Sequence, residues 1–370
     1  MKLLTVSHFY DAHGGGIERV AAQLCSQFSR AGHDVIWAAS SSDCPPCGSV
    51  EALPLKCINP IEALTGLPMP IPGPGSIMAL AKAIRKCDAV IVHDSLYITS
   101  VFAMFLAKLA GKPIVLVQHI AGITFASAAM RVIMRLANFL ITKRMLNAAD
   151  GRVFISDVVR RELLGEGAWR KSIVLYNGVD TSIFYLRKSL NEPTVRVAYG
   201  LPSGVPLAIF VGRFVQKKGL SILEVVARRN PGLHIALVGA GHLNPSNWDL
   251  PNVHVLGVLE QWKIGELFNA SDFLLLPSVG EGFPLVIQEA MACGLPVICG
   301  QESAGADPEA SRWLTGVSIE LGDIRSSAER VSAAIAGLKM DENEREAMAT
   351  YAADHYNWEK MAKNLVALVK

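Results

Sequence analysis

Short apolar runs alternate with helical segments along most of the chain. Runs at 34–38, 89–92 and 207–211 are almost wholly apolar, which is typical of parallel strands buried on both faces. Between such runs, apolar residues recur at helical spacing, as at 17–28 and 96–110. Strands that alternate with helices predict an α/β fold with doubly wound parallel sheets.

A change of composition divides this series. Residues 187–205 mix charge, proline and glycine, and a fresh strand follows at Pro206. The chain has 370 residues, which is enough for two or three domains. We therefore expect a second α/β domain in the second half of the chain, followed by helices at about 325–338, 342–354 and 358–369.

The most distinctive stretch is 277–297, which predicts a loop, a helix and the start of a strand. It follows a buried strand at 272–276. Pro284 suits the first turn of a helix, where its missing N–H costs nothing, and Gly294 suits the C-cap. The loop would then lie at the carboxyl end of a parallel strand, where open α/β sheets bind ligands.

Two carboxylates mark this unit. Glu281 lies in the loop, and Glu289 follows on the helix. Gly282 leaves the backbone amides accessible, and a helix N-terminus offers further unpaired N–H donors. Such a site suits a polyhydroxyl ligand that carries negative charge. The alternative is a solvated loop and one surface glutamate.

A cluster of cations follows the first strand of the second domain. Arg213, Lys217 and Lys218 precede a helix that opens near Gly219. Arginine can bind a phosphate bidentately and lysine binds it as a point charge, so the cluster suits a diphosphate. Three solvated surface charges are the alternative.

Three strand ends in the first half of the chain carry residues that suggest a second site. Gly14, Gly15 and Gly16 separate the first strand from the first helix, so that a ligand or another backbone segment can come close. Their spacing differs from the dinucleotide fingerprint, and a tight turn is the alternative. His119 ends a strand at the ligand side of the sheet; a structural histidine is the alternative there. His93 and Asp94 occupy a similar edge with weaker support.

The run 277–297 resembles the donor-sugar signature of the retaining glycosyltransferases of family 4, which have the GT-B fold. Similar matches occur at 14–18, 119, 177–180, 212–219, 239–241 and 356–359. The resemblance implies two Rossmann-like domains that face each other across a cleft, with the last helix returning to the first domain. The domains implied are 1–175 plus 355–370 on the acceptor side and 176–354 on the donor side.

The resemblance also implies a role for each matching residue. Arg213 and Lys218 would hold the nucleotide diphosphate, and Glu289 would bond the ribose hydroxyls. Glu281 would hold the sugar hydroxyls, and His119 would contact the sugar from the opposite domain. The catalytic residues implied are His119, Arg213, Lys218 and Glu281, and the donor-binding residues are Gly15, Gly16, Gly212, Gly241, Gly282, Phe283, Pro284, Leu285 and Glu289.

The reaction expected is transfer of a hexose-type sugar from a UDP- or GDP-sugar to a glycan or lipid-linked acceptor, with retention. The chain has no Asp-x-Asp pair, so we expect no metal ion and no cofactor beyond the nucleotide-sugar co-substrate. Alternatives are another GT-B enzyme of nucleotide sugars, such as an epimerase, and a non-catalytic protein that binds nucleotide sugars.

Charge and cysteine content limit the partners and the compartment. A net charge of +2 gives no sign of nucleic-acid binding. Residues 1–8 resemble a buried strand more than a signal peptide, and no stretch makes a good membrane span. Seven scattered cysteines fit reduced thiols, so we expect a cytoplasmic protein. Cys44 and Cys47 form a C-x-x-C pair without a second pair to complete a metal site.

Two segments raise the question of a membrane surface. Residues 125–147 predict a long, basic, amphipathic helix, which suits peripheral binding to an anionic membrane. The alternative, which we favour, is a helix whose apolar side, including Phe139 and Ile141, faces the core. Residues 59–76 are rich in proline and glycine and predict a loop that contacts an acceptor lipid or packs on the domain.

Overall fold

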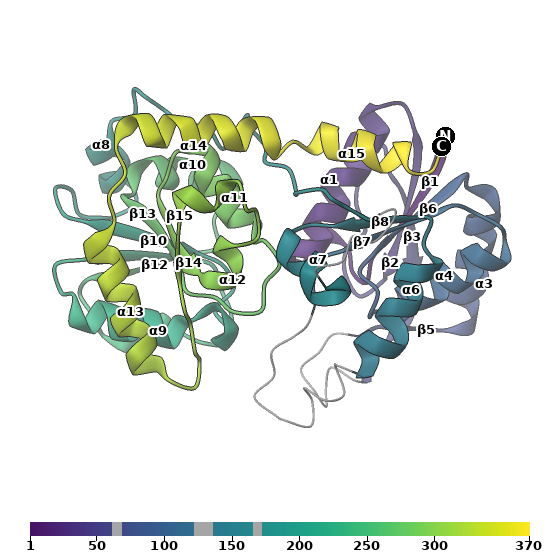
Figure 1. Ribbon diagram of the computed structural model, residues 1–370, viewed down its shortest axis with the longest axis horizontal. Coiled ribbons are helices and arrows are strands. Elements are labelled where there is room, and N and C mark those ends of the chain that lie inside the picture. The colour runs from purple at the N-terminus through teal and green to yellow at the C-terminus, as the bar shows by residue number, and fades with distance from the viewer. Residues whose placement is uncertain (61–68, 122–135, 166–171) are drawn as a thin grey trace. The chain divides into compact units, whose positions relative to one another are not determined.

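The computed structural model describes residues 1–60, 69–121, 136–165 and 172–370. The chain forms two compact units, Met1–Asn177 with Trp358–Lys370, and Gly178–Asn357 (Figure 1). The unit boundaries fall two residues after the sequence-based boundary at 175 and three after the one at 354.

The first unit is built on a parallel sheet of seven strands in the order β3-β2-β1-β6-β7-β8-β9. Its central strands are buried on both faces, as their apolar runs predict. β4 (Cys57–Ile58) and β5 (Ile71–Pro72) form a separate, short antiparallel pair. They fall between β3 and β6 in chain order. The strands of the sheet are β1 (Lys2–Val6), β2 (Asp34–Ser40), β3 (Glu51–Leu55), β6 (Ala89–His93), β7 (Ile114–Gln118), β8 (Gly151–Phe154) and β9 (Ser172–Val174).

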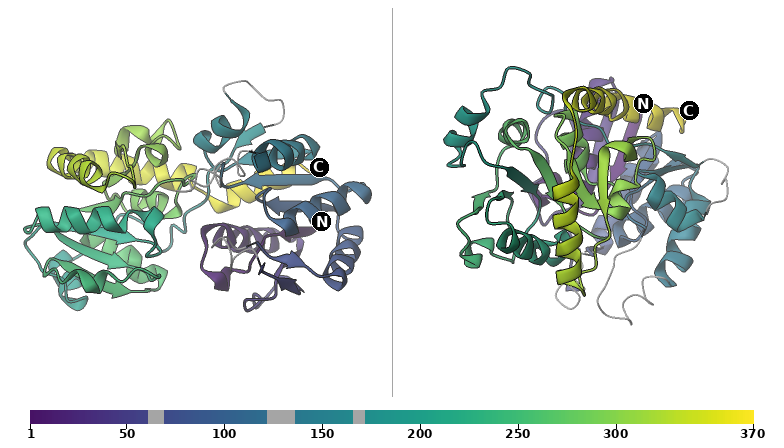
Figure 2. Two further views of the ribbon diagram at one scale, coloured as in Figure 1. Left: turned by 90° about the horizontal axis from the view of Figure 1, so that it is seen from below. Right: turned by 60° about the vertical axis from the view of Figure 1, so that its left-hand side comes forward.

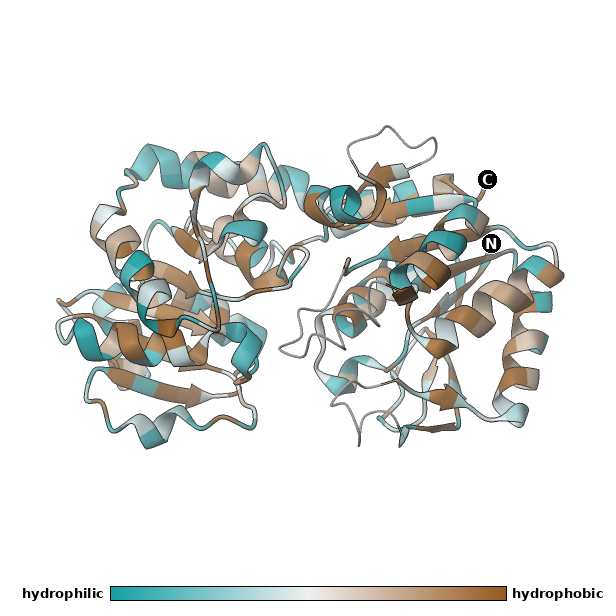
Figure 3. Ribbon diagram, turned by 60° about the horizontal axis from the view of Figure 1, so that its bottom comes forward, coloured by the Kyte–Doolittle hydropathy of each residue, from teal (hydrophilic) through white to brown (hydrophobic). Residues whose placement is uncertain are grey.

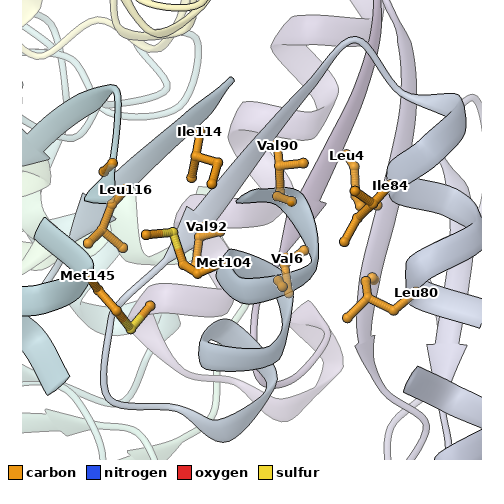
Figure 4. Packing of buried hydrophobic residues seen from close by; sticks show 14 of the residues in the cluster. Leu4, Val6, Leu80, Ile84, Val90, Val92, Met104, Ile114, Leu116 and Met145 are labelled. Carbon is orange, nitrogen blue, oxygen red and sulfur yellow. The ribbon is translucent and has the colours of Figure 1, made fainter. Parts of the chain in front are cut away.

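Helices cover both faces of this sheet (Figure 2). On one face α1 (Gly16–Arg30) packs on the C-terminal helix α15 (Trp358–Ala367). On the other, α3 (Pro74–Lys86) packs on α4 (Ile98–Leu109). Figure 4 shows the core beneath α3 and α4, formed by Leu4, Val6, Leu80, Ile84, Val90, Val92, Met104, Ile114, Leu116 and Met145. The remaining helical segments are η1 (Asp11–His13), the π-helical η2 (Asn138–Thr142), α6 (Lys143–Ala148) and α7 (Asp157–Leu164).

The second unit repeats this design with a parallel sheet of six strands in the order β12-β11-β10-β13-β14-β15. In Figure 3 the strands of both sheets are coloured mostly hydrophobic, as buried strands should be. The strands are β10 (Leu207–Val211), β11 (His234–Val238), β12 (Val253–Gly257), β13 (Phe273–Leu276), β14 (Val297–Gly300) and β15 (Leu314–Val317). The helices are α8 (Glu192–Ala198), η3 (Gln216–Lys218), α9 (Leu220–Arg229), η4 (Pro245–Trp248), α10 (Gln261–Ala270), α11 (Leu285–Ala292), α12 (Gln301–Ala304), η5 (Ala310–Trp313), α13 (Ile324–Gly337) and α14 (Glu342–His355).

The prediction of two doubly wound parallel sheets is therefore confirmed. The prediction of an unbroken loop at 59–76 is wrong in its last part, because β5 and the start of α3 lie there. Pro74 begins α3, where its fixed φ suits a helix and its missing N–H costs nothing. Residues 61–68 of this segment lie outside the described residues.

The segment predicted as one amphipathic helix is also different. Residues 136–148 are helical but pass through the π-helical turn η2, and the earlier part of the segment lies outside the described residues. Met145 and Leu146 are buried, whereas Phe139 and Ile141 are exposed. The extra residue per turn of a π-helix changes which side chains face the sheet, so the interpretation that Phe139 and Ile141 face the core is wrong. Among the described residues, no helix is both long and apolar enough to span a bilayer.

Candidate functional site

Three loops of the second unit meet at one edge of its sheet. They follow β10, β11 and β13, which are neighbours in the order β11-β10-β13. All three strands are parallel, so the loops leave the same, carboxyl edge. This is the edge at which open α/β sheets bind ligands.

Two of these loops are packed tightly against each other. Gly219 has φ +79°, and a Cβ atom there would collide with the carbonyl group of Pro277. The Val279 N–H donates to the Lys217 carbonyl at 3.0 Å. Glycine at 219 therefore allows the β10–α9 loop to lie directly on the β13–α11 loop.

This packing places Lys218 beside Glu281. Lys218 Nζ lies 2.7 Å from Glu281 Oε1 and 2.8 Å from Oε2. Each side chain is only 13% exposed. Burial by itself would raise the pKa of Glu281, but the charges of Lys218 and Lys217 and the hydrogen bond from Lys218 lower it below its usual value. Glu281 is therefore a carboxylate, and Lys218 is its partner.

The same loop carries two further cations. Burial lowers the pKa of Lys217, the charges of Lys218 and Arg213 lower it further, and Glu281 partly opposes them. Arg213 is exposed and makes no ion pair within the described ranges. The β10–α9 loop thus carries three cations, of which only Lys218 is paired with Glu281, and such a local concentration of positive charge suits an anionic ligand.

The two predicted glycines after β10 and β11 differ in what their neighbours require. A Cβ at Gly212 would lie 3.7 Å from Lys218 Cε and 3.4 Å from the Phe210 ring, which are ordinary contact distances, so its neighbours do not require glycine there. A Cβ at Gly241 would collide with the carbonyl of Phe214. Gly241 is therefore required by the close approach of two backbone segments, whether or not a ligand is bound.

The remaining predicted donor residues lie at the start of α11. The helix begins at Leu285, one residue later than predicted, and Pro284 precedes it and accepts from the Ile287 N–H at 3.0 Å. Gly282 is buried, and the Phe283 ring packs edge-on against Tyr356 with centroids 5.6 Å apart. Glu289 lies on the buried side of α11 and is 4% exposed.

In the first unit, one glycine of the glycine loop lies directly against a buried carboxylate. Gly14 has φ +78°, and a Cβ at Gly15 would collide with the Glu18 carboxylate. Glu18 Oε1 lies 2.7 Å from His8 Nε2, and both side chains are buried. Burial would raise the pKa of Glu18, but the hydrogen bond and charge of His8 lower it. Gly15 thus makes room for Glu18, whereas a Cβ at Gly16 would meet open space.

Sequence reasoning missed His8 and Glu18 as site residues. Glu18 falls among the apolar positions of α1 that face the sheet, Val20, Ala21 and Leu24. Burying a carboxylate at a core position costs free energy unless the carboxylate has a partner. The position of Glu18 on the apolar side of α1 was therefore the sign in the sequence that it pairs with another group.

His119 lies at the same edge of the first sheet, directly after β7. Its Nε2 atom is 3.0 Å from Nδ1 of His93, the last residue of β6. Burial lowers the pKa of His93 to about 3, and burial together with the charge of His93 holds the pKa of His119 well below its usual value. Both imidazoles are therefore neutral at pH 7. Because β1, β6 and β7 are adjacent, His8 shares this edge.

Asp94 supports the same strand end. It has φ +62°, a left-handed conformation that aspartate adopts more readily than most residues with a side chain and that persists where the surrounding structure fixes it. Its carboxylate accepts from the Ser95 N–H at 2.8 Å, from Gln118 Nε2 at 2.9 Å and from the Ile120 N–H at 3.3 Å. Burial raises its pKa to about 6.

The described residues contain no group of three or more His, Cys, Asp or Glu side chains that could hold a metal ion. Cys44 and Cys47 are both exposed and carry free thiols.

Comparison with known proteins gives two matching family models, one for each half of the chain. Residues 14–183 match the model for Glycosyltransferase Family 4. Residues 191–355 match the model for Glycosyl transferases group 1.

Curated relatives agree with these matches. The sulfoquinovosyl transferase SQD2 of Arabidopsis thaliana is 29% identical over 295 residues, which cover 74% of this chain and 55% of the relative. A D-inositol 3-phosphate glycosyltransferase of Corynebacterium urealyticum is 28% identical over 218 residues, which cover 53% of this chain and 50% of the relative. The chain thus spans about half the length of these curated relatives.

Solved structures share the fold. Sucrose-phosphate synthase from Thermosynechococcus elongatus superposes with a TM-score of 0.74 at 18% identity, covering 100% of this chain and 98% of that one. HepE from Anabaena in complex with UDP-glucose superposes with a TM-score of 0.69 at 18% identity, covering 99% and 98%. These structures show that the chain has the GT-B fold. Because family models match both halves of the chain, the protein belongs to the group 1 glycosyltransferases of family 4.

Proposed function

We propose that the protein transfers a hexose-type sugar from a UDP- or GDP-sugar to a glycan or lipid-linked acceptor, with retention and without a metal ion. The observation that carries this proposal is the buried Lys218–Glu281 ion pair in a loop with excess positive charge. The relatives named as sulfoquinovosyl and inositol phosphate glycosyltransferases support sugar transfer. The UDP-glucose complex of HepE supports a nucleotide-sugar donor.

In this proposal Arg213 and Lys218 receive the diphosphate of the donor. Lys218 already has a carboxylate partner, so an arriving phosphate shares or replaces that contact. Glu281 is then able to accept hydrogen bonds from sugar hydroxyls, together with the backbone at 282–284. Glu289 bonds the ribose hydroxyls. Of these charges, the packing of the two loops already holds Lys218 and Glu281 in place.

Chemically, the bond between the anomeric carbon and the diphosphate oxygen breaks while the acceptor oxygen attacks from the same face. The leaving diphosphate gains negative charge, which the fixed cations stabilise, and it takes the proton of the acceptor hydroxyl. The product keeps the anomeric configuration of the donor, which proton NMR of the product reads directly. An inverted product would exclude the retaining part of the proposal.

We predict that Arg213→Ala and Lys218→Ala each lower kcat about 100-fold, because losing one group that stabilises developing charge costs roughly 3 kcal/mol of barrier. Transfer of labelled sugar under saturating donor measures this. Arg213 is the cleaner test, because its removal leaves no buried partner behind. Lys218→Ala also leaves Glu281 unpaired, so its thermal unfolding is measured alongside.

The matched controls are Arg325→Ala and Lys339→Ala, which remove exposed cations of the same unit from α13 and from the segment after it. Their rates should equal that of the unmodified protein. Wild-type rates in both Arg213→Ala and Lys218→Ala would contradict the proposal that these two residues bind the diphosphate. Donor binding without transfer in the unmodified protein would favour a non-catalytic nucleotide-sugar-binding protein.

A second prediction concerns metal ions. If protein cations alone stabilise the diphosphate, the initial rate in excess chelator should match the untreated rate. Adding back Mg²⁺ or Mn²⁺ should not change it. Loss of activity in chelator, with recovery on adding one of these ions, would contradict the metal-free mechanism.

We also propose that residues 136–148 contact an anionic membrane surface. Leu136 is 55% exposed and Phe139 62%, and Leu140 and Ile141 are exposed beside them. Lys143 and Arg144 follow on the next turn, and Lys143 Nζ lies 5.4 Å from the centre of the Phe139 ring. Exposed apolar side chains next to cations are typical of helices that bind at the lipid headgroup boundary.

We predict that the double substitution of Phe139→Ser and Leu140→Ser weakens sedimentation with vesicles containing phosphatidylglycerol by at least about 10-fold, since each lost apolar group contributes roughly 1.5–3 kcal/mol when fully buried. Val258→Ser is the control, because Val258 is 76% exposed in the other unit. Vesicle binding that is unchanged by the double substitution, or equally weakened by the control, would contradict this proposal.

A further inference from the structure

Two buried histidines of the first unit share one hydrogen bond. His93 Nδ1 and His119 Nε2 are 3.0 Å apart, and the rings lie nearly parallel with centroids separated by 5.2 Å. His93 is fully buried and His119 is 3% exposed. Since both rings are neutral, a single proton occupies this hydrogen bond, and its position fixes the tautomer of each ring.

Two arrangements satisfy the bond. In the first, His93 Nδ1–H donates to His119 Nε2, which leaves the His119 proton on Nδ1 and a bare lone pair on His93 Nε2. In the second, His119 Nε2–H donates to His93 Nδ1, which leaves an N–H group on His93 Nε2 and a bare lone pair on His119 Nδ1. The two arrangements differ in what they leave at His93 Nε2.

The surroundings of His93 Nε2 decide between them. This atom is buried and has no hydrogen-bond partner among the residues that the structure describes. A buried N–H donor without a partner is rarer in proteins than an acceptor whose lone pair is unused. The first arrangement leaves only an unused lone pair at this atom and is therefore favoured.

We propose that His93 is a positioning residue that fixes the tautomer of His119, so that His119 carries its proton on Nδ1 and offers an Nδ1–H donor to a substrate oxygen. The tautomer itself follows from the first unit alone. Its consequence for catalysis rests on the proposed transferase function and on the contact with the donor sugar that the family resemblance implies for His119.

Hydrogen bonds that do not involve the His93 ring fix the backbone around His119. The Asp94 carboxylate binds Gln118 Nε2 at 2.9 Å and the Ile120 N–H at 3.3 Å, so it holds the residues on both sides of His119. Asp94 adopts its left-handed conformation, φ +62°, to do so. Consecutive residues at the end of β6 thus hold the same histidine, His93 through its ring and Asp94 through its neighbours.

The test is ¹⁵N NMR of the full-length protein labelled at histidine, in which long-range ¹H–¹⁵N correlations show which ring nitrogen carries the proton. We expect His119 in the Nδ1–H form in the unmodified protein. In His93→Asn the side-chain amide can still donate to His119 Nε2, so the Nδ1–H form should persist. In His93→Phe that donor is lost, and His119 should change to the Nε2–H form that imidazole prefers in water.

Transfer assays provide a second readout. We expect kcat to fall about tenfold or more in His93→Phe, with recovery of most of the rate in His93→Asn and little change in KM in either variant. His254→Phe is the control, because His254 and His234 form a pair of similar geometry, 2.9 Å apart, in the other unit. That substitution should leave the His119 signals and the rate unchanged.

An Nε2–H form of His119 in the unmodified protein would overturn the proposal, and so would a tautomer that does not respond to His93→Phe. The spectrum of the unmodified protein decides the first point even if a variant fails to fold. If the protein shows no transfer activity with any nucleotide sugar, the proposed function fails while the tautomer assignment is still decided by NMR.

Discussion

The account depends on one buried ion pair, between Lys218 and Glu281. Taking two charges out of water costs several kcal/mol for each, and the cost is recovered only with close geometry and further hydrogen bonds. Here the lysine bonds both carboxylate oxygens at 2.7 and 2.8 Å, and Lys217 and Arg213 add positive charge nearby. In the proposed donor site, Lys218 would bind phosphate and Glu281 would bind sugar hydroxyls. In the free protein each neutralises the charge of the other, until a ligand with both a phosphate and hydroxyl groups binds.

The fold makes this pair possible through strand order and close backbone packing. Parallel neighbours β10 and β13 bring their following loops to one edge, and Gly219 lets the two loops touch. In the first unit, neighbouring parallel strands also bring residues far apart in the sequence to one sheet edge, but the side chains gathered there are different. His93 is the last residue of β6, and His8 and His119 follow the neighbouring strands β1 and β7. Burial keeps His93 and His119 neutral. The second unit therefore presents a cluster of lysines beside a carboxylate, whereas the first unit presents two neutral imidazoles beside the buried Glu18–His8 pair.

Much of this could be predicted from the sequence, because it depends on local pattern. Apolar runs gave the strands, and the residues that follow them, such as Arg213 and His119, were placed at the ligand edge. The contacts between distant residues could not be predicted. Lys218 and Glu281 are 63 positions apart, and each was assigned a separate part of the donor. The pairing of Glu18 with His8 depends on how α1 packs on β1, and the exposure of Phe139 depends on a π-helical turn that sequence periodicity does not reveal.

The most direct test of the central claim is calorimetric titration of UDP and GDP into three proteins: the unmodified chain, Lys218→Met and Glu281→Gln. If Lys218 is the diphosphate ligand and Glu281 competes for it, Glu281→Gln should bind the nucleotide at least as tightly as the unmodified chain, and Lys218→Met should bind it far more weakly. If the two substitutions weaken binding equally, or if Lys218→Met leaves it unchanged, the ion pair is not where the diphosphate is received.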